Sequence, residues 1–239
     1  MASPYYRFRP GAGWGAHLFK AAVRQDHAPW AATLAPYLPR DGIAIDVGAH
    51  GGQVTRLLAR LAPDGMVVAV EPSGYARSIL RPALWARRTR NVVVVAAGLG
   101  ATPGIVLLRT PLKRRGEMGF GLATLGVPDR AAVAEPVAVV TLDALVTALA
   151  LPRVDLIKAD IEGFEDALIA GATATLRTHR PALLLEMSDP LLRRAGASLD
   201  GLWGRLTASG YGPHGRAADG TLVPHAGPPA DGDYVWLPA

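Results

Sequence analysis

The sequence contains no cysteine, and lysine occurs only at positions 20, 113 and 158. The absence of cysteine excludes a disulfide scaffold, a thiolate zinc site and a cysteine nucleophile. Long apolar runs are also missing, because glycine and proline interrupt the longest uncharged stretch, residues 92–108, in its middle. We expect two buried strands joined by a turn there and no membrane span. The polar, aromatic start is unlike a signal peptide, so we expect a soluble, cytoplasmic protein.

The composition is that of a globular chain. Of 239 residues, 50% are hydrophobic and 19% are charged, which excludes a disordered protein. The net charge of +5 comes almost entirely from arginine. This charge reflects either a GC-rich genome, which the scattered placement of arginine favours, or a nucleic-acid partner. The densest basic segment is residues 81–90.

Hydrophobic periodicity predicts alternating strands and helices. Runs of Val, Ile and Ala at 43–47, 66–70 and 91–96 predict strands, and residues 53–61 and 75–88 have helical spacing. Continuous apolar strands are typical of a parallel sheet covered on both faces, so we predict a doubly wound α/β fold. Residues 1–41 are expected to form a helical extension and residues 42–239 the main domain.

A glycine-rich loop follows the first strand, with Asp46, Gly48 and Gly52 in the run DVGAHGG. Ligands of open α/β sheets bind beyond the carboxyl ends of the strands, where glycine permits close approach. The loop lacks both Gly-x-Gly-x-x-Gly and Gly-Lys-Ser/Thr, and Asp46 would repel a pyrophosphate. It therefore favours a cofactor without phosphates, although the glycines could also serve only a tight turn.

The second strand ends at Glu71, about 20 residues after the loop, where an acidic residue typically binds ribose hydroxyls. Together with the loop, this residue predicts an adenosine-type ligand. The alternative is an exposed acid that begins a helix before Pro72.

Several segments in the same order resemble the FkbM family of S-adenosylmethionine-dependent methyltransferases. They are DVGAHGG at 46–52, VEP at 70–72, TLD at 141–143, IKADIEGFE at 157–165 and LE at 185–186. The family usually has Asn at the position of His50. The resemblance implies a class I methyltransferase, Rossmann-like fold with a mostly parallel seven-strand sheet whose last strand is antiparallel.

The resemblance also implies how the chain holds S-adenosylmethionine. The expected cofactor-binding residues are Asp46, Gly48, His50 and Gly52 near the amino-acid part, Glu71 with Pro72 and Ser73 at the ribose, Ala96 and Ala97 near the adenine, and Asp160 beside the sulfonium.

The candidate catalytic residues are Lys158, Asp160, Glu162 and His50. Strand alternation places Lys158 and Asp160 on one face, and a buried Lys158 needs a carboxylate partner, either Asp160 or Glu186. A hydroxyl acceptor must lose a proton, for which Asp160 is the first choice and Glu162 or His50 the alternatives. Glu165 and Asp166 suit the start of a helix by their charge alone.

A metal site is conceivable at Asp160, Glu162 and Glu186, but the spacing does not require one and we predict none. Residues 113–129 are rich in glycine and are expected to form a lid over the acceptor, or otherwise a surface loop. Trp14, Phe8 and Tyr5/Tyr6 could extend the pocket, form a homodimer contact or pack on the core.

We expect transfer of a methyl group to a hydroxyl oxygen of a sugar, glycan or secondary metabolite. Two alternatives stay open: an RNA methyltransferase, although nucleic acid is the less expected partner, and a catalytically silent binding protein with the same fold.

Overall fold

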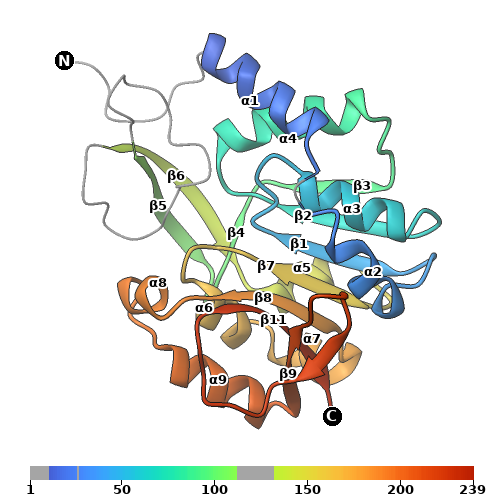
Figure 1. Cartoon of the computed structure of the whole chain (residues 1–239). Coiled ribbons are helices and arrows are strands. Elements are labelled where there is room, and N and C mark those ends of the chain that lie inside the picture. The colour runs from blue at the N-terminus through green and yellow to red at the C-terminus, as the bar shows by residue number, and fades with distance from the viewer. Residues whose placement is uncertain (1–10, 26, 112–131) are drawn as a thin grey trace.

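A computed structural model describes residues 11–25, 27–111 and 132–239. Its centre is one large sheet (Figure 1). In chain order, the strands of this sheet are β1 (Ile43–Val47), β2 (Met66–Val70), β3 (Val92–Val95), β7 (Leu156–Ala159), β8 (Ala182–Met187), β9 (Tyr211–Arg216), β10 (Leu222–Pro224) and β11 (Gly232–Pro238). No helix in the described ranges is long and apolar enough to cross a membrane.

The sheet has the spatial order β10-β9-β11-β8-β7-β1-β2-β3. Strands β3, β2, β1, β7 and β8 pair in parallel, whereas β11 runs antiparallel to both β8 and β9. The predicted doubly wound, mostly parallel sheet with an antiparallel final strand is confirmed. It has eight strands rather than seven, because the short β10 pairs antiparallel to β9 and extends the edge.

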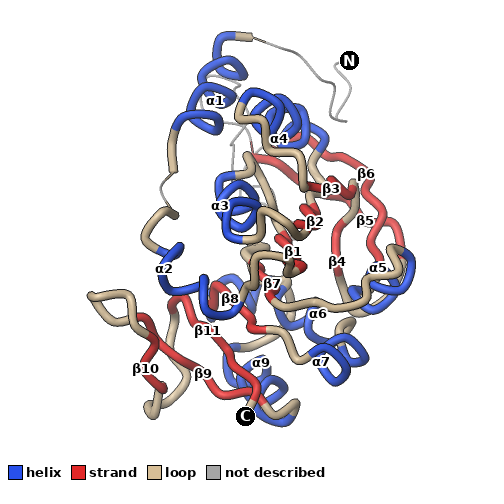
Figure 2. Tube along the Cα trace, turned by 90° about the vertical axis from the view of Figure 1, so that its right-hand side faces the viewer, coloured by secondary structure: helices blue, strands red, loops and turns tan. Residues whose placement is uncertain are grey.

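Helices cover both faces of the sheet (Figures 1 and 2). They are α1 (Ala12–Val23), α2 (Trp30–Leu34) with the 3-10 turn η1 (Ala35–Tyr37), α3 (Gln53–Leu61), α4 (Gly74–Ala86), α5 (Leu142–Ala148), α6 (Glu165–Ala170), α7 (Thr173–His179), α8 (Asp189–Arg194) and α9 (Leu199–Ala208). The apolar spacing of residues 163–176 also predicts one helix, and that prediction is wrong. The segment divides at Gly171, where a Cβ would lie 2.2 Å from the Gly100 carbonyl oxygen.

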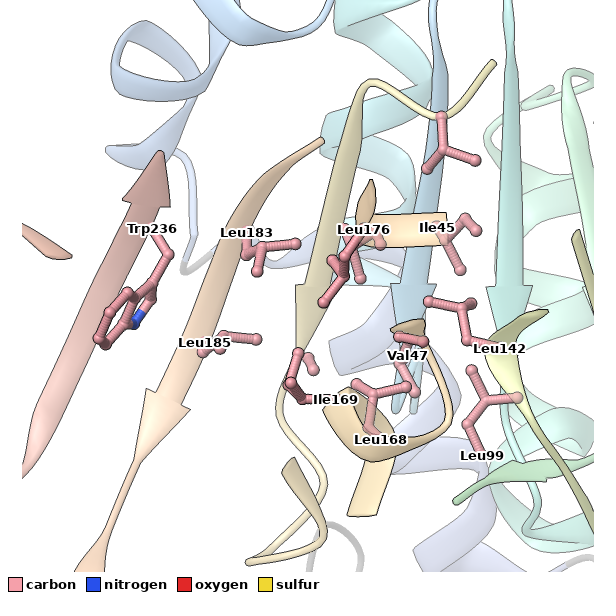
Figure 3. Packing of buried hydrophobic residues seen from close by; sticks show 14 of the residues in the cluster. Ile45, Val47, Leu99, Leu142, Leu168, Ile169, Leu176, Leu183, Leu185 and Trp236 are labelled. Carbon is pink, nitrogen blue, oxygen red and sulfur yellow. The ribbon is translucent and has the colours of Figure 1, made fainter. Parts of the chain in front are cut away.

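Strand alternation sends neighbouring side chains of β1 to opposite faces. Ile45 and Val47 join a large apolar cluster with α5, α6, α7 and α9 (Figure 3), whereas Ala44 packs toward α2 and α3. Trp236 on β11 is fully buried in the first cluster and donates its indole N–H to the Met187 sulfur at 3.3 Å. The two apolar clusters thus lie on opposite faces of β1, and each buries alternate side chains of this strand.

A second, three-stranded sheet was not predicted. It consists of β4 (Gly98–Leu99), β5 (Gly104–Pro111) and β6 (Ala132–Val140), in the order β4-β6-β5. The two strands expected in 92–108 are present as β3 and β5, with the short β4 between them, but neither strand is fully buried. Val93 is 39% exposed because β3 is an edge strand, and Ile105 is 80% exposed because one face of β5 is uncovered.

Residues 11–41 contribute α1, α2 and η1. Helix α1 packs on α4 through a small cluster that contains Ala21, Tyr75, Ile79 and Ala83. The division of the chain at residue 41 stays a prediction.

Candidate active site

A cavity of about 480 Å³ opens at the carboxyl ends of β1, β2 and β7. This volume is within the range typical of small-molecule sites. Its walls come from the strand ends of the large sheet, the second sheet, α1 with the residue His27 after it, and the first turns of α3 and α4. The arrangement follows the general rule that open parallel sheets bind ligands beyond their carboxyl ends.

The glycine loop after β1 forms part of the cavity wall. Gly48 has φ +74°, and a Cβ there would lie 2.2 Å from the Asp160 carbonyl oxygen, so only glycine permits this approach of the loop to the end of β7. Gly52 has φ +81° and caps α3, where it packs against Leu80. Gly48 lines the cavity and Gly52 lies behind it.

Glu71 is buried at the end of β2 and lines the cavity. Its Oε2 accepts the His50 backbone N–H at 2.8 Å, and its Oε1 accepts the Ser73 N–H at 2.7 Å. Burial raises the pKa of Glu71 to about 7, although both N–H groups oppose that shift. Each oxygen keeps a lone pair that can accept a hydroxyl donor. Pro72 and Ser73 also line the cavity.

Asp46 lies beneath the cavity rather than in its wall. Its side chain is fully buried on the α3 side of β1, where Oδ2 accepts the Thr55 hydroxyl at 2.6 Å and Oδ1 lies 3.3 Å from Lys158 Nζ. Within the chain, Asp46 contacts Thr55 and Lys158, and its expected contact with the cofactor stays a prediction.

Lys158 is buried next to Asp46, because β1 and β7 pair in parallel with these two residues in register. Burial disfavours the charged ammonium, but Asp46 and Asp160 outweigh that effect and raise the pKa of Lys158. The sequence offered Asp160 or Glu186 as its partner, and the ion pairs run to Asp46 and Asp160.

Asp160 directly follows β7 and reaches the cavity with 46% of its side chain exposed. Glu186 at the end of β8 lines the same cavity and shares a side-chain hydrogen bond with Asp160. Burial, followed by this hydrogen bond, raises the pKa of Glu186 to about 8. Burial works against ionisation of Asp160, but Lys158 and the bond to Glu186 lower its pKa. These opposite shifts favour a proton on Glu186 over one on Asp160.

The turn after Asp160 is held by Glu165. Glu162 has φ +56° and lines the cavity, and burial and Asp160 raise its pKa. Glu165 is buried, accepts the Ile161 N–H at 2.9 Å, and has its pKa raised to about 7 by burial. Glu165 does lie at the start of α6, but the interpretation by charge alone missed this contact. Asp166 forms an ion pair with Arg205 at 2.9 Å.

His50 lines the cavity in a left-handed backbone conformation, with φ +50°. Burial and nearby Lys158 lower its pKa to about 4. A neutral imidazole at physiological pH can accept or donate a hydrogen bond there.

Of the two residues expected near the adenine, one lines the cavity and the other does not. Ala97 is buried and lines the cavity, whereas Ala96 is exposed and lies outside it. Sequence reasoning missed several cavity residues because they belong to elements outside the strand–loop pattern. They are Leu99, Leu108 and Thr110 of the second sheet, Lys20 and Ala21 of α1, and His27.

Arg56 on α3 holds the end of α1 against the cavity by hydrogen bonds. Its buried guanidinium donates to the carbonyl oxygens of Ala21, Ala22 and Arg24 at 2.6, 2.9 and 2.8 Å. These carbonyls belong to the end of α1, which has no further helical turn to satisfy them. These three carbonyl acceptors explain how the buried guanidinium of Arg56 is accommodated in the interior.

Two further expectations concern the cavity surroundings. The predicted lid at 113–129 lies outside the described residues, as do Tyr5, Tyr6 and Phe8. Trp14 packs against α4 and donates its indole N–H to Ser78 Oγ at 3.0 Å. Within the described ranges, no group of three or more His, Asp or Glu side chains is arranged to hold a metal ion.

Comparison with known proteins identifies one matching family and many solved structures with a similar fold. The model of the methyltransferase FkbM domain matches residues 46–212. No curated protein is similar enough in sequence to count as a relative.

Solved structures are similar in fold at low identity. An FkbM methyltransferase from Methylobacillus flagellatus has 14% identity and a TM-score of 0.52 over 94% of this chain and 58% of its own. An O-methyltransferase from Bacillus cereus, in complex with SAH, has 14% identity and a TM-score of 0.52, over 97% of this chain and 93% of its own. A putative rRNA methylase from Clostridium thermocellum has 8% identity and a TM-score of 0.51, over 90% and 94%. The chain thus spans little more than half the length of the first of these proteins.

Proposed function

This chain belongs to the FkbM methyltransferase family, and from that premise we propose that it transfers a methyl group from S-adenosylmethionine to a hydroxyl oxygen of a sugar, glycan or secondary metabolite. The single observation that carries the proposal is that Glu71 and Asp160 line one cavity, each directly after a parallel strand that neighbours β1.

The donor set of the cavity fits an adenosyl sulfonium. Glu71 retains free lone pairs for ribose hydroxyls, and Ala97, Leu99 and Leu108 offer apolar surface for a base. Asp160 and Glu162 give the opposite wall a negative charge, which suits a cationic group. Asp46 supports the loop from below, through Thr55 and Lys158.

S-adenosylmethionine supplies an already activated methyl group, so the protein contributes mainly position and a place for one proton. Asp160 is the proposed acceptor of the hydroxyl proton, because it reaches the cavity and Lys158 keeps it ionised. The hydrogen bond shared with Glu186 favours the ionised form of Asp160. Neutral His50 and Glu162 are the alternative acceptors.

The test combines cofactor binding with turnover. Calorimetry with S-adenosylhomocysteine should detect binding by the purified wild-type protein, and methyl-labelled S-adenosylmethionine should label a hydroxyl-bearing acceptor from a panel of sugars, glycans and polyols. In Asp160→Asn, labelling should fall about 100-fold or more while S-adenosylhomocysteine binding persists. Absence of S-adenosylhomocysteine binding by the wild type would refute the proposal, and full labelling by Asp160→Asn would refute the role of Asp160.

RNA is the second candidate acceptor, because Arg81, Arg87 and Arg88 are exposed around Trp85, which is 83% exposed. However, α4 begins beside Glu71 and carries these residues away from the cavity over 13 residues, a helix length of about 20 Å. A hydroxyl of a small acceptor therefore has the better support. Salt-dependent binding of RNA, together with methyl labelling of the RNA, would instead favour RNA over a small hydroxyl acceptor.

A further inference from the structure

One buried ammonium group joins the floor of the cavity to its wall. Only 7% of the Lys158 side chain is exposed, and its Nζ lies 3.3 Å from Asp46 Oδ1 and 3.8 Å from Asp160 Oδ2. The same Nζ donates to the carbonyl oxygens of Gly48 at 3.2 Å and Val47 at 3.4 Å. Four oxygens from two strands and one loop therefore converge on it.

These contacts follow from the strand register. Asp46 and Lys158 are paired neighbours on β1 and β7, and alternation turns both side chains toward α3. A buried carboxylate without a cation is strongly disfavoured, so Asp46 holds Lys158 in place. Asp160 lies two residues further along β7 and shares the ammonium from the cavity side.

We propose that Lys158 is a positioning residue, whose ammonium fixes Asp160 as an ionised carboxylate and ties it to the Gly48 turn. The inference rests on the proposed function only in one respect, namely that Asp160 accepts the proton of the acceptor hydroxyl. The contacts of Lys158 exist independently of the acceptor.

Most groups around Asp160 are acidic. The titratable groups that act on Asp160 or feel its charge are Lys158 on β7, His50 after β1, Glu162 and Glu165 after β7, Glu186 on β8, Asp233 on β11, and His27 before α2. His50 is neutral at physiological pH. Without Lys158, the remaining carboxylates would favour protonation of Asp160, and it could no longer accept the hydroxyl proton.

The experiment measures the titration of Asp160 directly, so it needs no acceptor. Wild-type protein labelled with 13C at the aspartate carboxyl carbon is titrated by NMR, with Asp160→Asn to assign the signal. Lys158→Met alone would leave Asp46 as an uncompensated buried charge and unfold the protein readily. The informative variant is therefore the double variant Asp46→Asn/Lys158→Met, which removes both charges together, with Asp46→Asn as its matched control.

In the wild type and in Asp46→Asn, Asp160 should titrate below the ordinary aspartate range. In the double variant its midpoint should rise by about one pH unit or more, because the cation is gone. Coinciding midpoints in the three proteins would overturn the proposal. If circular dichroism shows that the double variant is unfolded, the Asp160 midpoint of the wild-type protein is the deciding measurement. A wild-type midpoint at or above the ordinary aspartate value would then overturn the proposal.

Calorimetry with S-adenosylhomocysteine on the same samples separates the two proposals. Wild-type protein that does not bind S-adenosylhomocysteine refutes the proposed function. The Asp160 midpoints still decide the role of Lys158 in that case.

Discussion

At the scale of single residues, the cavity depends on carboxyl groups in unequal surroundings. Lys158 lowers the pKa of Asp160, whereas burial and Asp160 raise the pKa of the neighbouring Glu186 to about 8. Groups with such separated pKa values are typical of sites that move protons. Glu71 differs from both, since its two oxygens are already fixed by backbone N–H groups.

Glu71→Gln tests the ribose side of the cavity. The amide keeps one acceptor oxygen and leaves either the His50 or the Ser73 N–H without its partner, and it removes a charged acceptor for hydroxyls. Affinity for S-adenosylhomocysteine, measured by calorimetry, should fall about 10- to 100-fold.

Glu135→Gln is the matched control for this substitution. Glu135 accepts the Gly74 N–H with both oxygens, at 3.0 and 3.1 Å, but does not line the cavity. Its S-adenosylhomocysteine affinity should remain close to that of the wild type. Equal losses in the two variants would show that Glu71 acts only by anchoring backbone.

At the scale of elements, α1 completes a cavity that the large sheet leaves open on one side. Lys20 and Ala21 reach the cavity, and Arg56 holds the end of α1 by three carbonyl oxygens. The family match begins at residue 46, so this wall comes from outside the matched segment. Helix α1 therefore contributes to the site through one buried guanidinium and its packing on α4.

Arg56→Met should loosen α1 while leaving the large sheet intact. Loss of three hydrogen bonds from a charged donor costs roughly 2–4 kcal/mol of local stability. Amide hydrogen exchange over residues 12–23 should accelerate at least 10-fold, with exchange in β1 unchanged. Arg60→Met, an exposed position one turn further along α3, is the control and should exchange like the wild type. Unchanged exchange in Arg56→Met would show that packing alone holds α1.

At the scale of the whole molecule, buried acids make stability depend on pH. Glu71 and Glu165 have pKa values raised to about 7 and Glu186 to about 8, compared with 4.5 when unfolded. The folded state thus binds more protons than the unfolded state up to about pH 8, so these groups lower stability as pH rises. His50 acts oppositely, but only below its unfolded value of 6.5.

The protein should therefore lose thermal stability between pH 6.5 and pH 8.5. Glu165→Gln imitates the protonated acid at every pH, so the fall in Tm over this interval should be smaller than in the wild type. Differential scanning calorimetry at the two pH values measures both slopes. Equal slopes would mean that Glu165 titrates near its ordinary value in the folded protein.

The local pattern of the sequence was enough to predict the fold and to indicate that certain strand-end residues lie close together. Continuous apolar strands separated by amphipathic helices indicate a parallel doubly wound sheet, because side-chain periodicity is a property of each segment. The same order of segments put Gly48, Glu71 and Asp160 at strand ends, and parallel strands bring such ends to one edge. All three line the cavity.

The partners of the buried charges, however, were decided only by the tertiary structure. Asp46 faces Lys158 because β1 and β7 are neighbours in register, and Glu186 meets Asp160 because β8 lies next to β7. Strand order, register and the docking of α1 and the second sheet depend on contacts between segments far apart in the chain. No single segment of sequence encodes them, since each arises from the packing of two faces against each other.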